Sequence, residues 1–456
     1  MRLAAVLIVS ALSFRALGKE TPPAGSAPKP FTLAATDDFT LPNGMKVTLA
    51  HYGVVPKVAV RAYVDAGAVR EPENKIWLSR LTAQMVKEGT ATRSSEQIAS
   101  EAADMGGELE VDASEEATQA GGLVLSDYGS QFVALLGDVL SHASLPSSEL
   151  PRLKADLARQ LAVEKAQPRS LARERFFAVM YPNQPYGRTL PSESTITGFV
   201  LDDVQKFYNE NFTASRTHLY VVGKFDPSIK EAIRQAFSTW KSGQSAPTPP
   251  ANAARQYSLQ AIDRPGAAQS TVYMGLPVPG PKSPDYVTLD VMNSLLGGSF
   301  GSRITSNIRE AKGYTYSPFS NIGEAGRDSY WAEIADVTTA VTGPSLHEIF
   351  AEVNRLRKDP PSADELKGIQ NYLSGLFVLK NTISPDAVIS QLHFVDSQEL
   401  DRSFLFNYVQ KVDAVAPPDI QRVTESYITP SKMTVVVVGD KSKIADQLKT
   451  YEAAPQ

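Results

Sequence analysis

The organisation of this chain is indicated by the stretch Asp203-Val-Gln-Lys-Phe-Tyr-Asn-Glu-Asn-Phe-Thr-Ala-Ser-Arg-Thr-His-Leu-Tyr-Val-Val-Gly223. It aligns without a gap with Asp419-Ile-Gln-Arg-Val-Thr-Glu-Ser-Tyr-Ile-Thr-Pro-Ser-Lys-Met-Thr-Val-Val-Val-Val-Gly439, at an offset of 216 residues (203 to 419). Glu149-Leu150 and Glu365-Leu366 are separated by the same offset. A shared offset at two distant places indicates one duplicated unit of about 200 residues rather than a solenoid of short repeats.

Each half of the chain is expected to contain the same series of elements. Alternating or continuous apolar runs predict strands at 58–64, 219–222, 270–274 and 434–438. Apolar residues at helical spacing predict helices at 78–87, 95–105, 148–165 and from 363 onward. Ser147 and Ser362 are the expected N-caps of the last two. Mixed strands and helices of this kind predict α+β layers, a sheet with helices on one face.

The composition excludes several classes of chemistry. The chain has 456 residues, which predicts two or more domains, and 42% hydrophobic residues, which is typical of a globular protein. Its net charge of −5 gives no electrostatic reason to bind nucleic acid. It has no cysteine, so disulfides, thiolate metal sites and cysteine nucleophiles are ruled out. The closest two of its five histidines, His347 and His393, are 46 residues apart, so no His-x-x-Glu-His or His-x-x-x-His zinc motif occurs. No role is assigned to any of the five.

The N-terminus resembles a secretory signal. Arg2 supplies a positive charge, an apolar run follows at 4–14, and Ala16-Leu17-Gly18 offers small residues for cleavage. The apolar run is too short to span a bilayer, and no later segment is long enough, so we expect a periplasmic or secreted chain without a membrane span. The expected division is a signal peptide at 1–18, a disordered tether at 19–35, a first half at 36–241, a Pro-rich linker at 242–256 and a second half at 257–449.

Several motifs carry a resemblance to a known family. Phe39-Thr-Leu-Pro-Asn-Gly-Met-Lys-Val47, Val64-Asp-Ala-Gly67 and Lys87-Glu-Gly-Thr90 are followed in the second half by Leu296-Gly-Gly-Ser-Phe-Gly-Ser-Arg303 and Ile308-Arg-Glu-Ala-Lys-Gly-Tyr-Thr-Tyr316. In this order they resemble the pitrilysin/insulinase family of zinc metallopeptidases, which includes mitochondrial processing peptidase. The resemblance implies two homologous αβ halves, each with a mixed, mainly antiparallel sheet, closed like a clam around a peptide-binding chamber.

The zinc motif of that family is absent from this sequence. With Gly89-Thr90 as the anchor, the family's His-x-x-Glu-His falls on Arg80-Leu81-Thr82-Ala83-Gln84, and its third ligand, a Glu, falls on Gln160. We call Arg80, Ala83, Gln84 and Gln160 the degenerate positions. A guanidinium repels a cation, Ala83 cannot accept a proton from water, and amide oxygens bind zinc weakly. We therefore expect no metal on this chain, and Arg80, Gln84 and Gln160 to hydrogen-bond within the vacated site.

The second half retains the residues that the resemblance assigns to substrate contact. These are the glycines Gly297, Gly298 and Gly301, and the pair Arg309 and Tyr316, with Tyr314 as the rival for the Tyr position. Glycines let backbones approach closely, and a guanidinium and a phenol can both donate hydrogen bonds to an oxygen that gains charge. Taken without the family motif, the glycines are better explained by a helix C-cap with an ordinary turn. Arg309 and Tyr316 alone would equally suit a surface ion pair and a core ring.

The resemblance leads to one expected function and two alternatives. In some family members one chain carries the zinc motif, and a homologous partner carries the glycine-rich loop and the Arg/Tyr pair. This sequence resembles the second kind of subunit, so we expect a non-catalytic, substrate-binding subunit of a heteromeric zinc peptidase, with zinc on a partner that bears His-x-x-Glu-His. The first alternative is a peptide-binding or scaffolding protein of the cell envelope with no catalytic partner. The second, an enzyme with a metal-free mechanism, lacks any evident nucleophile–base pair.

Overall fold

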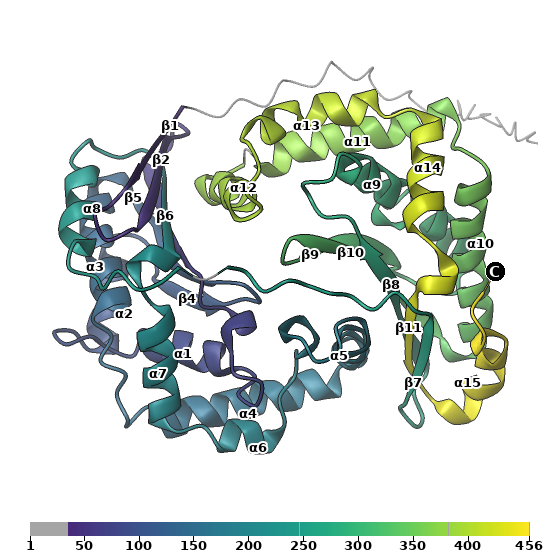
Figure 1. Cartoon of the computed structure of the whole chain (residues 1–456), viewed down its shortest axis with the longest axis horizontal. Coiled ribbons are helices and arrows are strands. Elements are labelled where there is room, and N and C mark those ends of the chain that lie inside the picture. Colours follow the sequence, from purple (N-terminus) through teal and green to yellow (C-terminus); the bar gives the residue numbers. More distant parts are fainter. Residues whose placement is uncertain (1–34, 246, 382, 456) are drawn as a thin grey trace, which may run out of the picture.

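The computed structural model describes residues 35–245, 247–381 and 383–455. The expected signal peptide and nearly all of the expected tether lie outside the described residues. Figure 1 shows two halves side by side, the first coloured purple to teal and the second green to yellow, with the connecting segment passing between them. The predicted arrangement of two αβ halves is confirmed.

Each half is built on one mixed sheet. The first sheet has the order β1-β2-β6-β3-β5-β4, in which only β2 and β6 pair in parallel. The second has the order β7-β11-β8-β10-β9, in which only β7 and β11 pair in parallel, so the parallel pair occupies the matching place. The bounds are β1 Thr36–Thr40, β2 Lys46–His51, β3 Lys57–Val64, β4 Glu110–Ala113, β5 Thr118–Leu125, β6 Thr217–Gly223, β7 Ser258–Asp263, β8 Gln269–Val278, β9 Phe319–Ala325, β10 Asp328–Thr338 and β11 Thr434–Gly439.

Helices pack on these sheets in both halves. The α-helices of the first half are α1 Leu78–Val86, α2 Ser95–Asp104, α3 Gly129–Ser141, α4 Leu150–Ala166, α5 Pro168–Met180, α6 Glu193–Thr197, α7 Leu201–Asn211 and α8 Ile229–Phe237. Those of the second are α9 Tyr286–Asn293, α10 Thr342–Lys358, α11 Ala363–Asn381, α12 Pro385–Ser397, α13 Ser403–Ala414, α14 Pro417–Tyr427 and α15 Lys441–Leu448. No helix in the described part of the chain is long and apolar enough to cross a membrane.

The start of the long helix of the first half differs from the prediction. Helix α4 begins at Leu150, its N-cap is Glu149 rather than Ser147, and no side chain caps it. Pro151 lies in the first turn, where a missing N–H costs nothing, and this fixes the start three residues beyond Ser147. The other predicted cap is confirmed, because the Glu365 N–H donates to Ser362 Oγ over 3.1 Å at the start of α11.

The two halves exchange one helix each. Helix α5 of the first half packs Phe176, Phe177 and Met180 against the second sheet, next to Tyr273 and Ile334. Helix α12 lies at the same place in the second half and packs back against the first sheet (Figure 1). Each sheet therefore carries the expected helices of its own half on one face and, on its other face, one helix from the opposite half. The exchange buries apolar surface between the halves and holds them together.

Polar and aromatic contacts supplement the apolar packing of α12. The ring of His393 stacks on Tyr63 with centroids 3.6 Å apart. The Tyr220 hydroxyl donates to Asp396 over 2.9 Å, and Arg61 Nε donates to Asp386, also over 2.9 Å. Because ring stacking and hydrogen bonds are directional, these three contacts fix the orientation of α12 on the first sheet.

Candidate functional site

Helix α1 carries three of the degenerate positions. Its N-terminus is held by the buried Glu71, whose carboxylate accepts hydrogen bonds from the N–H groups of Trp77 (2.9 Å) and Ser79 (2.8 Å). Leu81 and Ala83 face the core, with 0% and 1% of their surface exposed. Arg80 and Gln84 are half-buried one turn apart on the opposite side. The helix therefore turns two of the degenerate positions away from the core and buries the third.

A cavity of about 640 Å³ lies between α1 and α4. Arg80, Gln84 and Gln160 all line it, so Gln160 of α4 comes together with the two positions of α1 although it lies more than 70 residues away in the sequence. Ala83 does not line it. The hydrogen bonds that we expected among these side chains do not form in the described structure: Gln84 Oε1 is buried without a partner, and the Arg80 guanidinium lies 4.4 Å from the centre of the Trp77 ring. Burial lowers the pKa of Arg80, while the carboxylates of Glu164 and Glu71 oppose that shift.

The residues around this cavity do not fit a zinc ion. A catalytic zinc site needs three ligands drawn from neutral His and carboxylates, with an open position for water. Here a guanidinium stands at the first ligand position and amides at the other two. Among the described residues, no three His, Cys, Asp or Glu side chains are grouped closely enough to hold a metal ion. No step of metal-assisted hydrolysis can be built from these residues.

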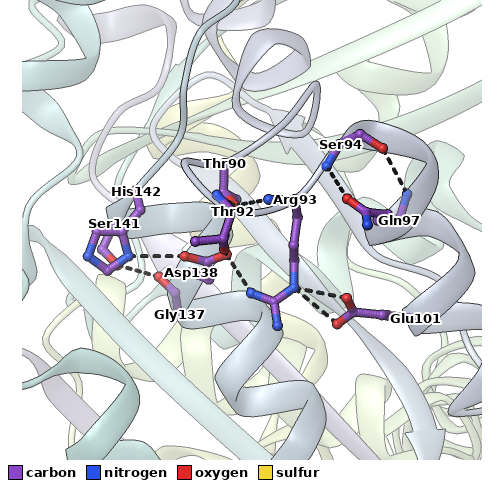
Figure 2. A network of polar contacts seen from close by, with 10 residues as sticks. All are labelled: Thr90, Thr92, Arg93, Ser94, Gln97, Glu101, Gly137, Asp138, Ser141 and His142. Atoms are coloured by element: carbon purple, nitrogen blue, oxygen red, sulfur yellow. Dashed lines mark hydrogen bonds and ion pairs between the residues drawn. The ribbon is translucent and has the colours of Figure 1, made fainter.

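The loop after α1, which contains Gly89-Thr90, has a structural role (Figure 2). Thr90 Oγ1 accepts the N–H groups of Thr92 (3.2 Å) and Arg93 (3.0 Å). The Arg93 guanidinium then joins Glu101 of α2 to Asp138 of α3, at 3.0 Å and 2.7 Å. Thr90 of the Gly-Thr pair thus fixes the turn that presents Arg93 to both α2 and α3.

In the second half, Arg309 lies between two aromatic rings. Its guanidinium carbon is 4.5 Å from the centre of the Phe300 ring and 5.0 Å from that of Tyr316, and its Nε is 3.0 Å from Glu310. Tyr316 is 79% exposed and Phe300 is 69% exposed. Tyr314, the rival, packs instead against the core of the second half. We call Phe300, Arg309 and Tyr316 the aromatic–arginine cluster; of the two tyrosines, only Tyr316 belongs to it.

The three glycines differ in their surroundings. A Cβ at Gly297 would lie 2.5 Å from Glu333 Oε2, and one at Gly298 would lie 2.5 Å from Asn293 Nδ2, so a larger residue at either position would force a neighbouring side chain to move. Gly301 is exposed and has open space around its Cβ position. Gly301 is therefore accessible to a ligand, whereas Gly297 is buried.

Sequence reasoning missed several features of this region. Gly297 and Gly298 end a π-helical segment, Ser294–Gly298, and Arg309 lies in another, Thr305–Ala311. Such turns are frequent at functional sites, but no residue pattern announced them. Behind Gly297, the carboxyl of Glu333 is fully buried without a hydrogen-bond partner, and this burial raises its pKa well above the usual value. A Glu at an inward position of an apolar strand was the one available signal.

Comparison with known protein families finds matches in both halves. Residues 46–193 match the family described as "Insulinase (Peptidase family M16)", and residues 198–373 match "Peptidase M16 inactive domain". Among the relatives, an uncharacterized zinc protease of Bacillus subtilis is 23% identical over 344 residues, which is 75% of this chain and 83% of that protein. A probable mitochondrial-processing peptidase subunit beta of Arabidopsis thaliana is 22% identical over 90% of this chain and 79% of its own length.

Solved structures have the same fold. A peptidase M16 inactive domain from Pseudomonas fluorescens superposes with a TM-score of 0.81 at 20% identity, covering 89% of this chain and 98% of that one. A protease from Helicobacter pylori gives 0.83 at 20% identity, covering 89% and 100%. The periplasmic protease PqqL of Escherichia coli gives 0.76 at 18% identity, covering 97% of this chain and 49% of that one. The chain therefore belongs to the insulinase family of peptidases, M16, and lacks that family's His-x-x-Glu-His motif.

Proposed function

We propose that this chain is a non-catalytic subunit that binds an extended peptide and presents it to a zinc-bearing homologue. The observation that carries the proposal is the contrast between the two halves. The first half places a cation and two amides where zinc ligands would stand, and the second half sets a half-buried arginine beside two exposed aromatic rings.

The aromatic–arginine cluster suits contact with a peptide backbone. A guanidinium presents five N–H donors, and peptide carbonyls are acceptors. Phe300 and Tyr316 hold the guanidinium from two sides, which reduces the conformational entropy lost when a peptide binds. Tyr316 as a residue is 79% exposed, and its hydroxyl makes no hydrogen bond within the described residues, so it remains available to a ligand.

We further propose export of this chain to the periplasm or the exterior. The support is the signal-like stretch at 1–18 and the likeness to a periplasmic protease of Escherichia coli. The chain would then meet its partner and its peptides outside the cytoplasm.

The test is co-purification of the chain with its partner from the native host, followed by zinc analysis and peptide-cleavage assays. The isolated chain should cleave nothing, and cleavage should appear or rise when a homologue with His-x-x-Glu-His is added. Arg309→Ala and Tyr316→Phe should each lower turnover of the pair at least about tenfold, since donors to a developing charge have effects of this size or larger. Full activity of the partner without this chain would refute the proposal and favour a scaffolding role.

A matched control separates contact from folding. Arg234→Ala removes an exposed arginine of α8 in the other half and should leave turnover of the pair unchanged. Thermal unfolding of all three variants should stay close to that of the wild type, because Arg234 and Tyr316 are exposed and Arg309 loses only an ion pair with the exposed Glu310 and contacts with two exposed rings.

A further inference from the structure

A second, smaller cavity of about 250 Å³ adjoins the first on the other side of Arg80. It is lined by the start of α1, the turn between β4 and β5, helix α5 and the segment around Arg188. We call it the arginine cavity. Its charged lining residues are Glu71, Arg80, Glu115, Arg173 and Arg188.

The three arginines of the arginine cavity are poorly paired. Neither Arg80 nor Arg188 makes a side-chain hydrogen bond or an ion pair with any described residue; Arg80 has the Trp77 ring as its neighbour. Arg173 lies 3.9 Å from Glu115, at the limit of an ion pair. Guanidinium groups in a partly buried position ordinarily take a carboxylate in a two-pronged hydrogen bond, and here that partner is missing.

The two carboxylates of the arginine cavity do not supply it. Glu71 is committed to the backbone and hydroxyl of the α1 N-terminus, where its oxygens accept from Trp77 and Ser79. Burial raises the pKa of the Glu115 carboxyl to about 7, so in about half of the molecules this carboxyl is uncharged at neutral pH. Glu164, the remaining nearby carboxylate, lines the larger cavity and hydrogen-bonds to Ser170. The three arginines that line the arginine cavity therefore outnumber its two carboxylates, and neither carboxylate pairs with Arg80 or Arg188.

We propose that the arginine cavity binds a carboxylate group of the peptide held between the halves, with Arg80 and Arg188 as its direct partners. This inference rests on the proposed function, and it names a chemical group of the peptide that the first half recognises. The arginine cavity adjoins Ala113, the last residue of the edge strand β4, and α5, the helix that crosses to the second half. A peptide lying between the two halves would pass this point. The carboxylate comes either from the peptide C-terminus or from an Asp or Glu side chain.

The test compares three labelled peptides of one extended sequence by fluorescence anisotropy on the full chain at low salt. The first has a free C-terminus and no acidic residue, the second an amidated C-terminus and one central Glu, and the third an amidated C-terminus and no acidic residue. We expect the first or the second to bind about tenfold more tightly than the third, which corresponds to one charge-assisted hydrogen-bonded pair. Whichever peptide gains identifies the source of the carboxylate.

Variants assign the gain to the cavity. Arg188→Gln should abolish the preference for the carboxylate peptide, whereas Arg175→Gln, at an exposed position of α5 outside the cavity, should preserve it. Binding of the carboxylate peptide should also change tryptophan emission, because Arg80 lies 4.4 Å from the Trp77 ring, and Arg80→Gln should remove that change. Equal binding of all three peptides, or a preference that survives Arg188→Gln, overturns this inference and leaves the proposed function standing. Absence of binding to every peptide overturns both.

Discussion

The packing of α12 on the first sheet should make the stability of the chain fall in mild acid through His393. Burial lowers the pKa of His393 from the usual 6.5 to about 4, and that of His218 beside it to about 3. A group whose pKa is lower in the folded chain binds its proton more readily when unfolded, so stability is lost as pH falls from about 6.5 toward 4. Between pH 7.5 and 5, one such histidine loses about 2 kcal/mol, at about 1.4 kcal/mol for each pH unit below 6.5.

The assay is urea unfolding at pH 7.5 and pH 5 of the wild type and of His393→Phe. Phenylalanine retains a ring to stack on Tyr63 and has no proton to bind, so the variant should lose about 2 kcal/mol less than the wild type over this interval. Neighbouring groups such as Asp396 and His218 titrate in both proteins, and their contributions largely cancel in the difference. His51→Phe, at the exposed end of β2, should keep the wild-type loss. Equal acid sensitivity of His393→Phe and the wild type would show that α12 does not bury this ring in solution.

Three further predictions concern the two halves separately. Glu333→Met should stabilise the chain at pH 7 by about 1–3 kcal/mol in urea unfolding, because it removes a buried carboxyl without a partner. Since the pKa of Glu333 is raised, the wild type loses stability as pH rises above about 4.5, and the gain from the substitution should shrink on acidification. A gain that does not depend on pH would contradict the raised pKa. Gly297→Ala should cost about 1–3 kcal/mol in the same assay, whereas Gly301→Ala should be nearly neutral, and equal effects would show that the π-helical segment is not packed as described. A chain with the substitutions Arg80→His, Ala83→Glu, Gln84→His and Gln160→Glu should retain about one zinc ion after dialysis, measured by plasma emission, while the wild type retains none. Zinc bound to the wild type would refute the interpretation of these four positions as degenerate.

Local patterns predicted the elements but not which half each helix covers. The strands at 58–64 and 434–438 were readable because apolar residues recur along them, and these residues are buried in the structure. The exchange of α5 and α12 depends on contacts between residues far apart in the chain, such as Phe176 with Tyr273, and no local pattern encodes them. The sequence offset identified two homologous halves, yet it carried no information about how they pack.

The sequence identified which residues line the candidate site, but not how their side chains pair with one another. The register set by Gly89-Thr90 led to Arg80, Gln84 and Gln160, which line one cavity. The same reasoning assumed that their side chains would satisfy each other, and Gln84 Oε1 has no partner. Side-chain pairing depends on rotamers and neighbours such as Trp77, which the spacing of a motif does not specify.

The packing of α1 on α4 explains how the first half keeps its shape without metal ligands. In a zinc site the metal would join these helices; here Leu81, Leu153 and Leu157 are at most 3% exposed between or beneath them, and Arg152 of α4 reaches Glu88 just after α1 over 2.8 Å. Burying one leucine contributes about 1.5–3 kcal/mol, so a few such contacts can hold the pair of helices on their own. Arg80, Gln84 and Gln160 line the cavity beside that packing rather than its apolar interior, so the leucine contacts do not depend on them. The loss of the metal ligands therefore leaves the two helices that form the cavity in place.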